Sequence, residues 1–177
     1  MITNKILNWK IKRNVKRRKG YKGQNPVAKM LFIFSVHPNQ DFSPLLKFKK
    51  QLEKKSKTVD LLGFFNGKKK DFQRKFDQPP FPILTRSDIN FFLSIKNPEL
   101  KELLPGNYDL LINFDLQKQS HVHFFASLAN AKLKVGLDTD RLEIYDLMVE
   151  RDGQLKSWSE VTHATTEVMD SVFSTDL

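Results

Sequence analysis

The side chains best suited to acid–base or metal chemistry follow two apolar runs of the chain. His37 and Asp115 each come just after a predicted buried strand, and His121 and His123 lie a few residues beyond Asp115. His37, Asp115 and His121 are residue types that can serve as a general acid or base or as metal ligands. However, His121 and His123 are two apart on a predicted helix, so they point about 200° away from each other and cannot face one metal. We therefore expect surface or capping roles here, with no metal site and no catalytic residue.

Phosphate-binding motifs are incomplete. No G-x-G-x-x-G occurs, and the first apolar run ends without a glycine. The segment 63–69 comes near a Walker loop, but Gly63 is one residue too close to Gly67 and Lys68, and Lys69 stands where Ser or Thr must hold magnesium. The chain has no cysteine, which excludes disulfides, thiolate zinc sites, iron–sulfur clusters and a cysteine nucleophile. We expect no cofactor, and we favour a non-enzymatic protein.

The charge of the chain is concentrated at its amino end. Of 177 residues, 30 are Lys or Arg and 20 are Asp or Glu, for a net charge of +10. Residues 1–23 carry nine of these cations and no acid, which leaves the remainder of the chain nearly neutral. A basic, acid-free arm on a neutral globule is typical of a tether for a polyanion. The alternative is a solvated tail that aids solubility.

The basic arm also has helical periodicity. Ile2, Ile6 and Trp9 follow one apolar spacing, and Leu7, Ile11 and Val15 follow a second. This pattern predicts a helix over residues 3–19, after which Gly20 and Gly23 place Tyr21 in a connector. Three interpretations are open: structured RNA, with Trp9 or Tyr21 stacked on a base; an anionic membrane surface; and a mitochondrial targeting peptide. Two apolar arcs rather than one stripe weaken the membrane interpretation, so we place RNA first.

From residue 26 onward, strands and helices alternate. We predict strands over 30–34, 59–65, 81–84, 89–95, 108–114, 132–135 and 144–149. We predict helices from Ser43 as N-cap to residue 56, over 97–104 and 119–130, and at the carboxyl end behind a capping box of Ser157 and Glu160. We predict that residues 66–80 form an exposed, basic excursion of the chain, that is, a connecting segment outside the regular elements. The fold class is therefore α/β, a three-layer sandwich with a mostly parallel five- or six-stranded sheet, Rossmann-like or flavodoxin-like. It forms one domain over residues 26–177, preceded by the basic arm over residues 1–25.

Part of this pattern resembles known families. The segments 108–115, 126–131 and 134–136 resemble an uncharacterised family of small Bacteroidetes proteins that is known as a domain of unknown function, with a looser match over about residues 100–170. The same strand–helix–strand unit is similar to one in the N-terminal half of heptosyltransferase-type glycosyltransferases. Those enzymes use a second Rossmann-like domain for the nucleotide sugar, and we expect no room for such a domain within these 177 residues. The resemblance implies a fold and no activity.

Our hypothesis is a non-enzymatic, RNA-associated protein, bound to ribosomal RNA or a ribonucleoprotein particle, with the α/β body available to dock on protein. One alternative is a small enzyme or metabolite-binding module at the sheet's carboxyl edge; another is a peripheral membrane protein anchored by the basic helix. The chain has no stretch long and apolar enough to span a bilayer, and no apolar segment typical of a secretory signal follows its basic start, so we expect a cytoplasmic protein. The candidate RNA-binding residues are Lys5, Trp9, Lys10, Lys12, Arg13, Lys16, Arg17, Arg18, Lys19, Tyr21 and Lys22, with Lys68, Lys69 and Lys70 as a second contact if that segment lies on the same side.

Overall fold

A computed structural model describes residues 2–15, 27–37, 40–55, 57–75, 79–90, 94–115, 117, 119–137, 141, 143–149 and 157–172. Its centre is a six-stranded sheet in which every neighbouring pair of described strands is parallel. The strands are β1 (Lys29–Ser35), β2 (Thr58–Phe65), β3 (Ile83–Thr85), β4 (Tyr108–Asn113), β5 (Ala131–Leu137) and β6 (Leu147–Val149). Their order across the sheet is β3-β2-β1-β4-β5-β6, which is Rossmann-like. The predicted α/β class is confirmed.

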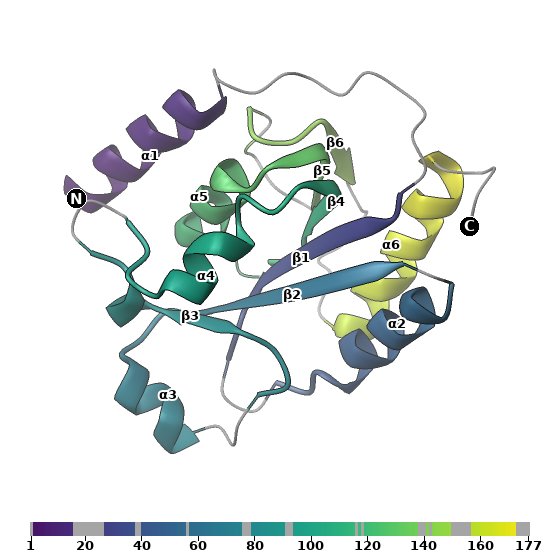
Figure 1. Ribbon diagram of the computed structural model, residues 1–177, viewed down its shortest axis with the longest axis horizontal. Helices are drawn as coiled ribbons and strands as arrows, with labels where there is room; N and C mark the ends of the chain where they lie inside the picture. The colour runs from purple at the N-terminus through teal and green to yellow at the C-terminus, as the bar shows by residue number, and fades with distance from the viewer. Residues whose placement is uncertain are drawn as a thin grey trace.

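Helices cover both faces of this sheet (Figure 1). They are α1 (Ile2–Val15), α2 (Ser43–Lys54), α3 (Lys69–Lys75), α4 (Pro98–Leu103), α5 (Ser120–Leu128) and α6 (Trp158–Val172), and a short 3-10 helix spans Arg86–Asp88. None of the described helices is long and apolar enough to cross a membrane.

Alternate residues of each strand supply the two halves of the core. On β1, Phe32 and Phe34 face α2 and α6, whereas Leu31 and Ile33 face α1, α4 and α5. Because successive side chains of a strand point to opposite faces, a strand covered on both faces must be apolar at nearly every position. This requirement is why residues 30–34 of β1 and 110–112 of β4 are unbroken apolar runs, and why these strands are the most readily predicted elements of the chain.

The sheet has a topological switch point between β1 and β4. From β1 the chain proceeds outward through β2 to β3, and from β4 it proceeds the other way through β5 to β6. In open α/β sheets, ligands bind beyond the carboxyl ends of the strands at such a point. The residues that follow β1 and β4 are therefore the first place to look for chemistry.

Three local predictions differ from the structure. The excursion after β2 contains the helix α3, because Phe72 is buried and packs on Phe65 with ring centroids 5.4 Å apart. Within the predicted strand at 89–95, residues 91–93 lie outside the described residues, and Ile89 and Ile95 form one antiparallel bridge instead of belonging to a strand of the sheet. Ser43 is the first residue of α2 rather than its N-cap, and its backbone N–H donates to Asp41 Oδ1 at 2.8 Å. The capping contact of α6 is confirmed, since the Glu160 N–H donates to Ser157 Oγ at 3.3 Å.

Candidate functional site

The basic amino-terminal helix is docked on the folded body. Leu7 and Ile11, one helical turn apart, are fully buried in the core on the α5 side of the sheet. Hydrogen bonds fasten the same helix at two further points: Asn14 Nδ2 donates to Ser127 Oγ at 3.1 Å, and Arg141 Nη2 donates to Asn8 Oδ1 at 2.9 Å. α1 is therefore a surface element of the α/β body, with one face committed to the core.

The opposite face of α1 carries an exposed aromatic ring beside a cation. Trp9 is 58% exposed, and the Arg13 guanidinium carbon lies 5.2 Å from the centre of its ring. This distance is within the range of a cation–π contact. Lys12 is exposed one turn after Trp9, while Lys10 is half-buried. Partial burial, followed by the charge of Arg13, lowers the pKa of Lys10.

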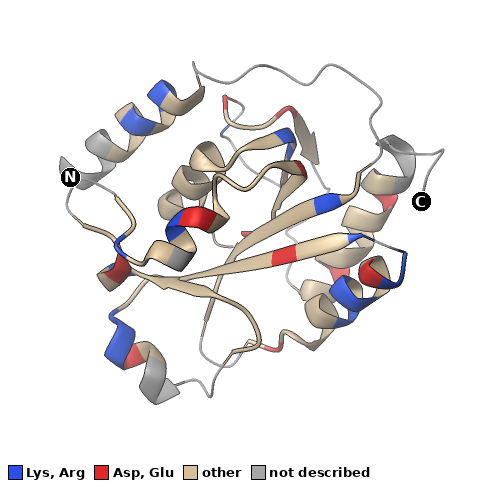
Figure 2. Cartoon of the chain, in the orientation of Figure 1, with Lys and Arg blue, Asp and Glu red and all other residues tan. Residues whose placement is uncertain are grey.

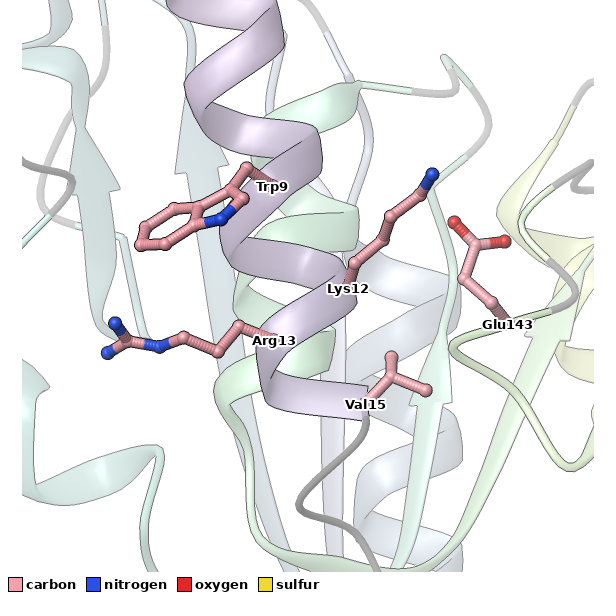
Figure 3. A pocket seen from close by; sticks show the side chains of 5 residues that line it. All are labelled: Trp9, Lys12, Arg13, Val15 and Glu143. Atoms are coloured by element: carbon pink, nitrogen blue, oxygen red, sulfur yellow. The ribbon is translucent and has the colours of Figure 1, made fainter.

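An open hollow of about 640 Å³ lies along this face, lined by Trp9, Lys12, Arg13, Val15 and Glu143. Figure 3 shows Trp9 and Arg13 extending together from one side of α1, with Lys12 and Val15 on the side nearer Glu143. Glu143 belongs to the segment before β6, and its Oε1 lies 3.5 Å from Nη1 of Arg141. Among the described lining residues Glu143 is the one acid, and a cation of the body holds it at the margin of the hollow.

The other predicted RNA-binding residues fall into two groups. Lys16, Arg17, Arg18, Lys19, Tyr21 and Lys22 lie outside the described residues, as does the side chain of Lys5 on α1. Lys68, Lys69 and Lys70 are exposed at the beginning of α3. Figure 2 shows the cations of α3 well separated from those of α1, with α4 between them. The described parts of the two basic segments therefore form separate surfaces.

At the switch point, Asp115 is held by its neighbours. The Ser35 hydroxyl donates to Asp115 Oδ1 at 2.5 Å, and the backbone N–H of Gln117 donates to the same oxygen at 3.1 Å. The backbone N–H of Gln119 donates to Oδ2. Burial raises the pKa of Asp115, and the hydrogen bonds from Ser35 and the two backbone groups oppose that rise. This carboxyl ties the end of β1 to the turn that begins α5.

The two candidate histidines beside Asp115 have partners of their own. His37 Nε2 is hydrogen-bonded to Gln117 Oε1, although its charge still favours the ionised form of Asp115. His121 stacks on Phe64 with ring centroids 5.1 Å apart, and burial and the nearby charge of Arg86 lower its pKa. No group of three His, Cys, Asp or Glu among the described residues could hold a metal ion. Gln117 thus contacts both His37, through its side chain, and Asp115, through its backbone N–H, whereas His121 packs on Phe64.

A buried polar cluster near Asp115 was not predicted from the sequence. Asn113 Nδ2 donates to the Tyr145 hydroxyl at 2.6 Å, and that hydroxyl lies 2.8 Å from His123 Nδ1. All three side chains are buried, and burial is the main reason that the pKa of Tyr145 is raised. The cluster links β4, α5 and the segment before β6. Sequence alone carries no signal for it, because the three residues are far apart in the chain and Asn113 and Tyr145 belong to no motif.

Comparison with protein-family models gave a match to one family. A family model described as a family of unknown function (DUF6913) matches residues 3–163, which includes α1 and the beginning of α6. Comparison with curated proteins and with solved structures gave no match.

Proposed function

The chain belongs to the family of unknown function DUF6913, and we propose that this member is a non-enzymatic RNA-associated protein that uses the outward face of α1. Its target class would be ribosomal RNA or a ribonucleoprotein particle. The observation that carries the proposal is the exposed Trp9 ring with Arg13 beside it, on a helix without acids.

This face suits RNA for two physical reasons. Unpaired bases stack on aromatic rings and on guanidinium planes, and such stacking contributes about 1–3 kcal/mol per base. Lysine and arginine neutralise phosphates and release counterions, which gives affinity that falls with salt. Trp9 and Arg13 supply the stacking surface, and Lys12 supplies a phosphate contact one turn further on. The basic residues that follow α1 in the sequence extend the same cationic segment.

The docking of α1 disfavours the membrane alternative. A helix that lies in a membrane surface must insert its apolar face among the lipids. Here Leu7 and Ile11 already occupy the protein core, and of the described large apolar side chains only Trp9 and Leu128 are exposed. Membrane binding would therefore require α1 to leave the body, whereas RNA binding uses the face that is already outward.

The metabolite-binding alternative has no comparable support. Its first candidate, Asp115, is buried and accepts hydrogen bonds from Ser35 and two backbone N–H groups. His37 is bound to Gln117 in the same region. The similarity to one strand–helix–strand unit of heptosyltransferases stays a resemblance in fold.

The test is RNA binding by the full chain, measured by fluorescence anisotropy with a labelled hairpin that has a single-stranded loop. We expect Trp9→Ala to weaken binding by about 1–3 kcal/mol, roughly 5- to 150-fold, and Trp9→Phe to retain most of the affinity. Lys12→Gln should reduce the slope of log K against log salt by about 0.7 to 0.9. Lys50→Gln removes an exposed cation from α2, on the opposite face of the sheet, and is the matched control. Equal affinities for the wild type, Trp9→Ala and Lys12→Gln would refute the proposal.

A further inference from the structure

A second surface of interest lies between α2 and α6, across the sheet from α1. Two adjoining hollows, of about 440 and 500 Å³, share Phe48, Gln51 and Thr166 as lining residues. One reaches toward the beginning of α2 at Ser43 and of α6 at Ser159, and the other reaches toward Lys55 and Met169. Together they form one groove, the α2–α6 groove, that follows the length of α2. Figure 1 shows α2 and α6 side by side on the side of the sheet away from α1.

The groove combines an apolar floor with a cationic margin. Phe48, Leu52 and Met169 line it and are themselves buried in the core. Its described lining cations are Lys47 and Lys54 on α2 and Lys55 directly after that helix. The one acid in the described lining is Asp41, at the amino end, where its Oδ1 accepts the Ser43 N–H.

The α6 side of the groove offers hydrogen-bond acceptors. The Thr162 hydroxyl donates to the Ser159 carbonyl at 3.0 Å, and the Thr166 hydroxyl donates to the Thr162 carbonyl at 2.9 Å. Because each hydroxyl proton is used within α6, the oxygen lone pairs of Thr162 and Thr166 can accept from a ligand. Gln51 is exposed between the two hollows and can both donate and accept.

We propose that the α2–α6 groove binds an acidic peptide segment of a protein partner, with an apolar side chain flanked by Asp or Glu. The apolar side chain would lie over Phe48, Leu52 and Met169, and the carboxylates would pair with Lys47, Lys54 or Lys55. Peptide N–H groups would donate to Thr162 and Thr166. α2 has 12 residues and is about 18 Å long, which accommodates about five residues of extended peptide.

The same observations argue against a nucleic acid in this groove. Binding of single strands relies on exposed aromatic rings for stacking, and the one Phe, Tyr or Trp ring in the described lining, Phe48, is buried. The lining cations on α2 are lysines, which act as point charges for carboxylates, and no described arginine lines the groove. Since α1 lies on the other face of the sheet, RNA and an acidic peptide could bind at the same time.

The test uses the purified full chain and a display library of random 12-residue peptides. We expect the enriched peptides to combine an apolar residue with neighbouring Asp or Glu. These peptides should bind the wild type and Lys50→Glu equally, because Lys50 is exposed on α2 but lines neither hollow. We expect the affinity for Lys54→Glu to be lower by about tenfold or more, since the substitution reverses a charge at the margin of the groove.

A second variant blocks the groove without changing its charge. Gln51→Trp places a large side chain at an exposed position where the two hollows meet, so it should weaken the enriched peptides to a similar degree and leave folding intact. The proposal is wrong if the library yields no enrichment, if the enriched peptides lack acids, or if their binding survives either variant. A labelled RNA hairpin is titrated in parallel; if Lys54→Glu and Gln51→Trp weaken the RNA instead of the peptides, the groove is an RNA surface and the peptide proposal fails.

Discussion

The docking of α1 makes a quantitative prediction for Leu7→Ala. Leu7 is fully buried in the core beneath α1, and replacing a buried leucine by alanine costs about 2–5 kcal/mol because it loses apolar burial and leaves a cavity. On a free arm the same substitution would cost nothing, since alanine is the stronger helix former. For a domain of this size each 1 kcal/mol corresponds to about 2–4 °C in Tm. The expected loss is therefore several degrees at least.

The assay is urea unfolding of Leu7→Ala together with amide hydrogen exchange of α1. If α1 detaches before the remainder unfolds, urea unfolding reports less than the full loss of stability. Exchange of the α1 amides accelerates whether α1 detaches first or unfolds together with the body. Trp9→Ala is the control, because its side chain is on the same helix and largely exposed. Unchanged urea midpoint and unchanged α1 exchange in Leu7→Ala would refute the docked helix, and with it our argument against the membrane alternative.

Three further predictions concern the body. Tyr145→Phe should destabilise the protein by about 1–3 kcal/mol in urea unfolding, because it removes the hydroxyl that partners buried Asn113 and His123; a stability equal to wild type would show that the cluster contributes nothing. Gly63→Ala should lower the thermal stability by about 1–3 kcal/mol, because the added Cβ would lie 2.6 Å from Val36 Cγ2 and 3.2 Å from the Phe81 ring; an unchanged Tm would mean that these side chains can move aside. Burial raises the folded-state pKa of Asp115 above 3.8, so its contribution to stability is fully present below pH 3.8 and is lost as the pH rises through the raised value. In urea titrations at increasing pH, the free energy of unfolding of Asp115→Asn should lack this decrease. A parallel pH dependence of the free energy of unfolding in wild type and variant would contradict the assignment to Asp115.

Elements that depend on local pattern were predicted well. β1, β2 and β4 follow from predominantly apolar runs, and α6 follows from its capping residues and the buried Trp158 and Val161. An error occurred where a packing contact between two elements outweighed the local pattern. α3 lies in a segment rich in lysine, and the burial of Phe72 against Phe65 on β2 accompanies its helical structure.

For the candidate site too, local pattern predicted one part and tertiary contacts decided the other. Composition and spacing singled out Trp9 and the cations near it as candidates, whereas the exposure of the Trp9 ring and the packing of its helix on the body came from the structure. The sequence has two apolar arcs on the basic helix, and nothing local distinguishes the arc of Leu7 and Ile11, which is buried, from the arc that contains Trp9.

Composition and periodicity alone thus determined the α/β class, the concentration of charge at the amino end and the absence of a thiolate or nucleotide motif, because each depends on residue types and on neighbours within a few positions. Only the tertiary structure decided which arc of α1 packs on α5, that Asn113, His123 and Tyr145 meet, and that α2 and α6 enclose a groove. Those arrangements depend on side chains brought together by the strand order β3-β2-β1-β4-β5-β6. Strand order is a choice between sheet neighbours that lie far apart in the chain, and hydrophobic periodicity carries no information about that choice.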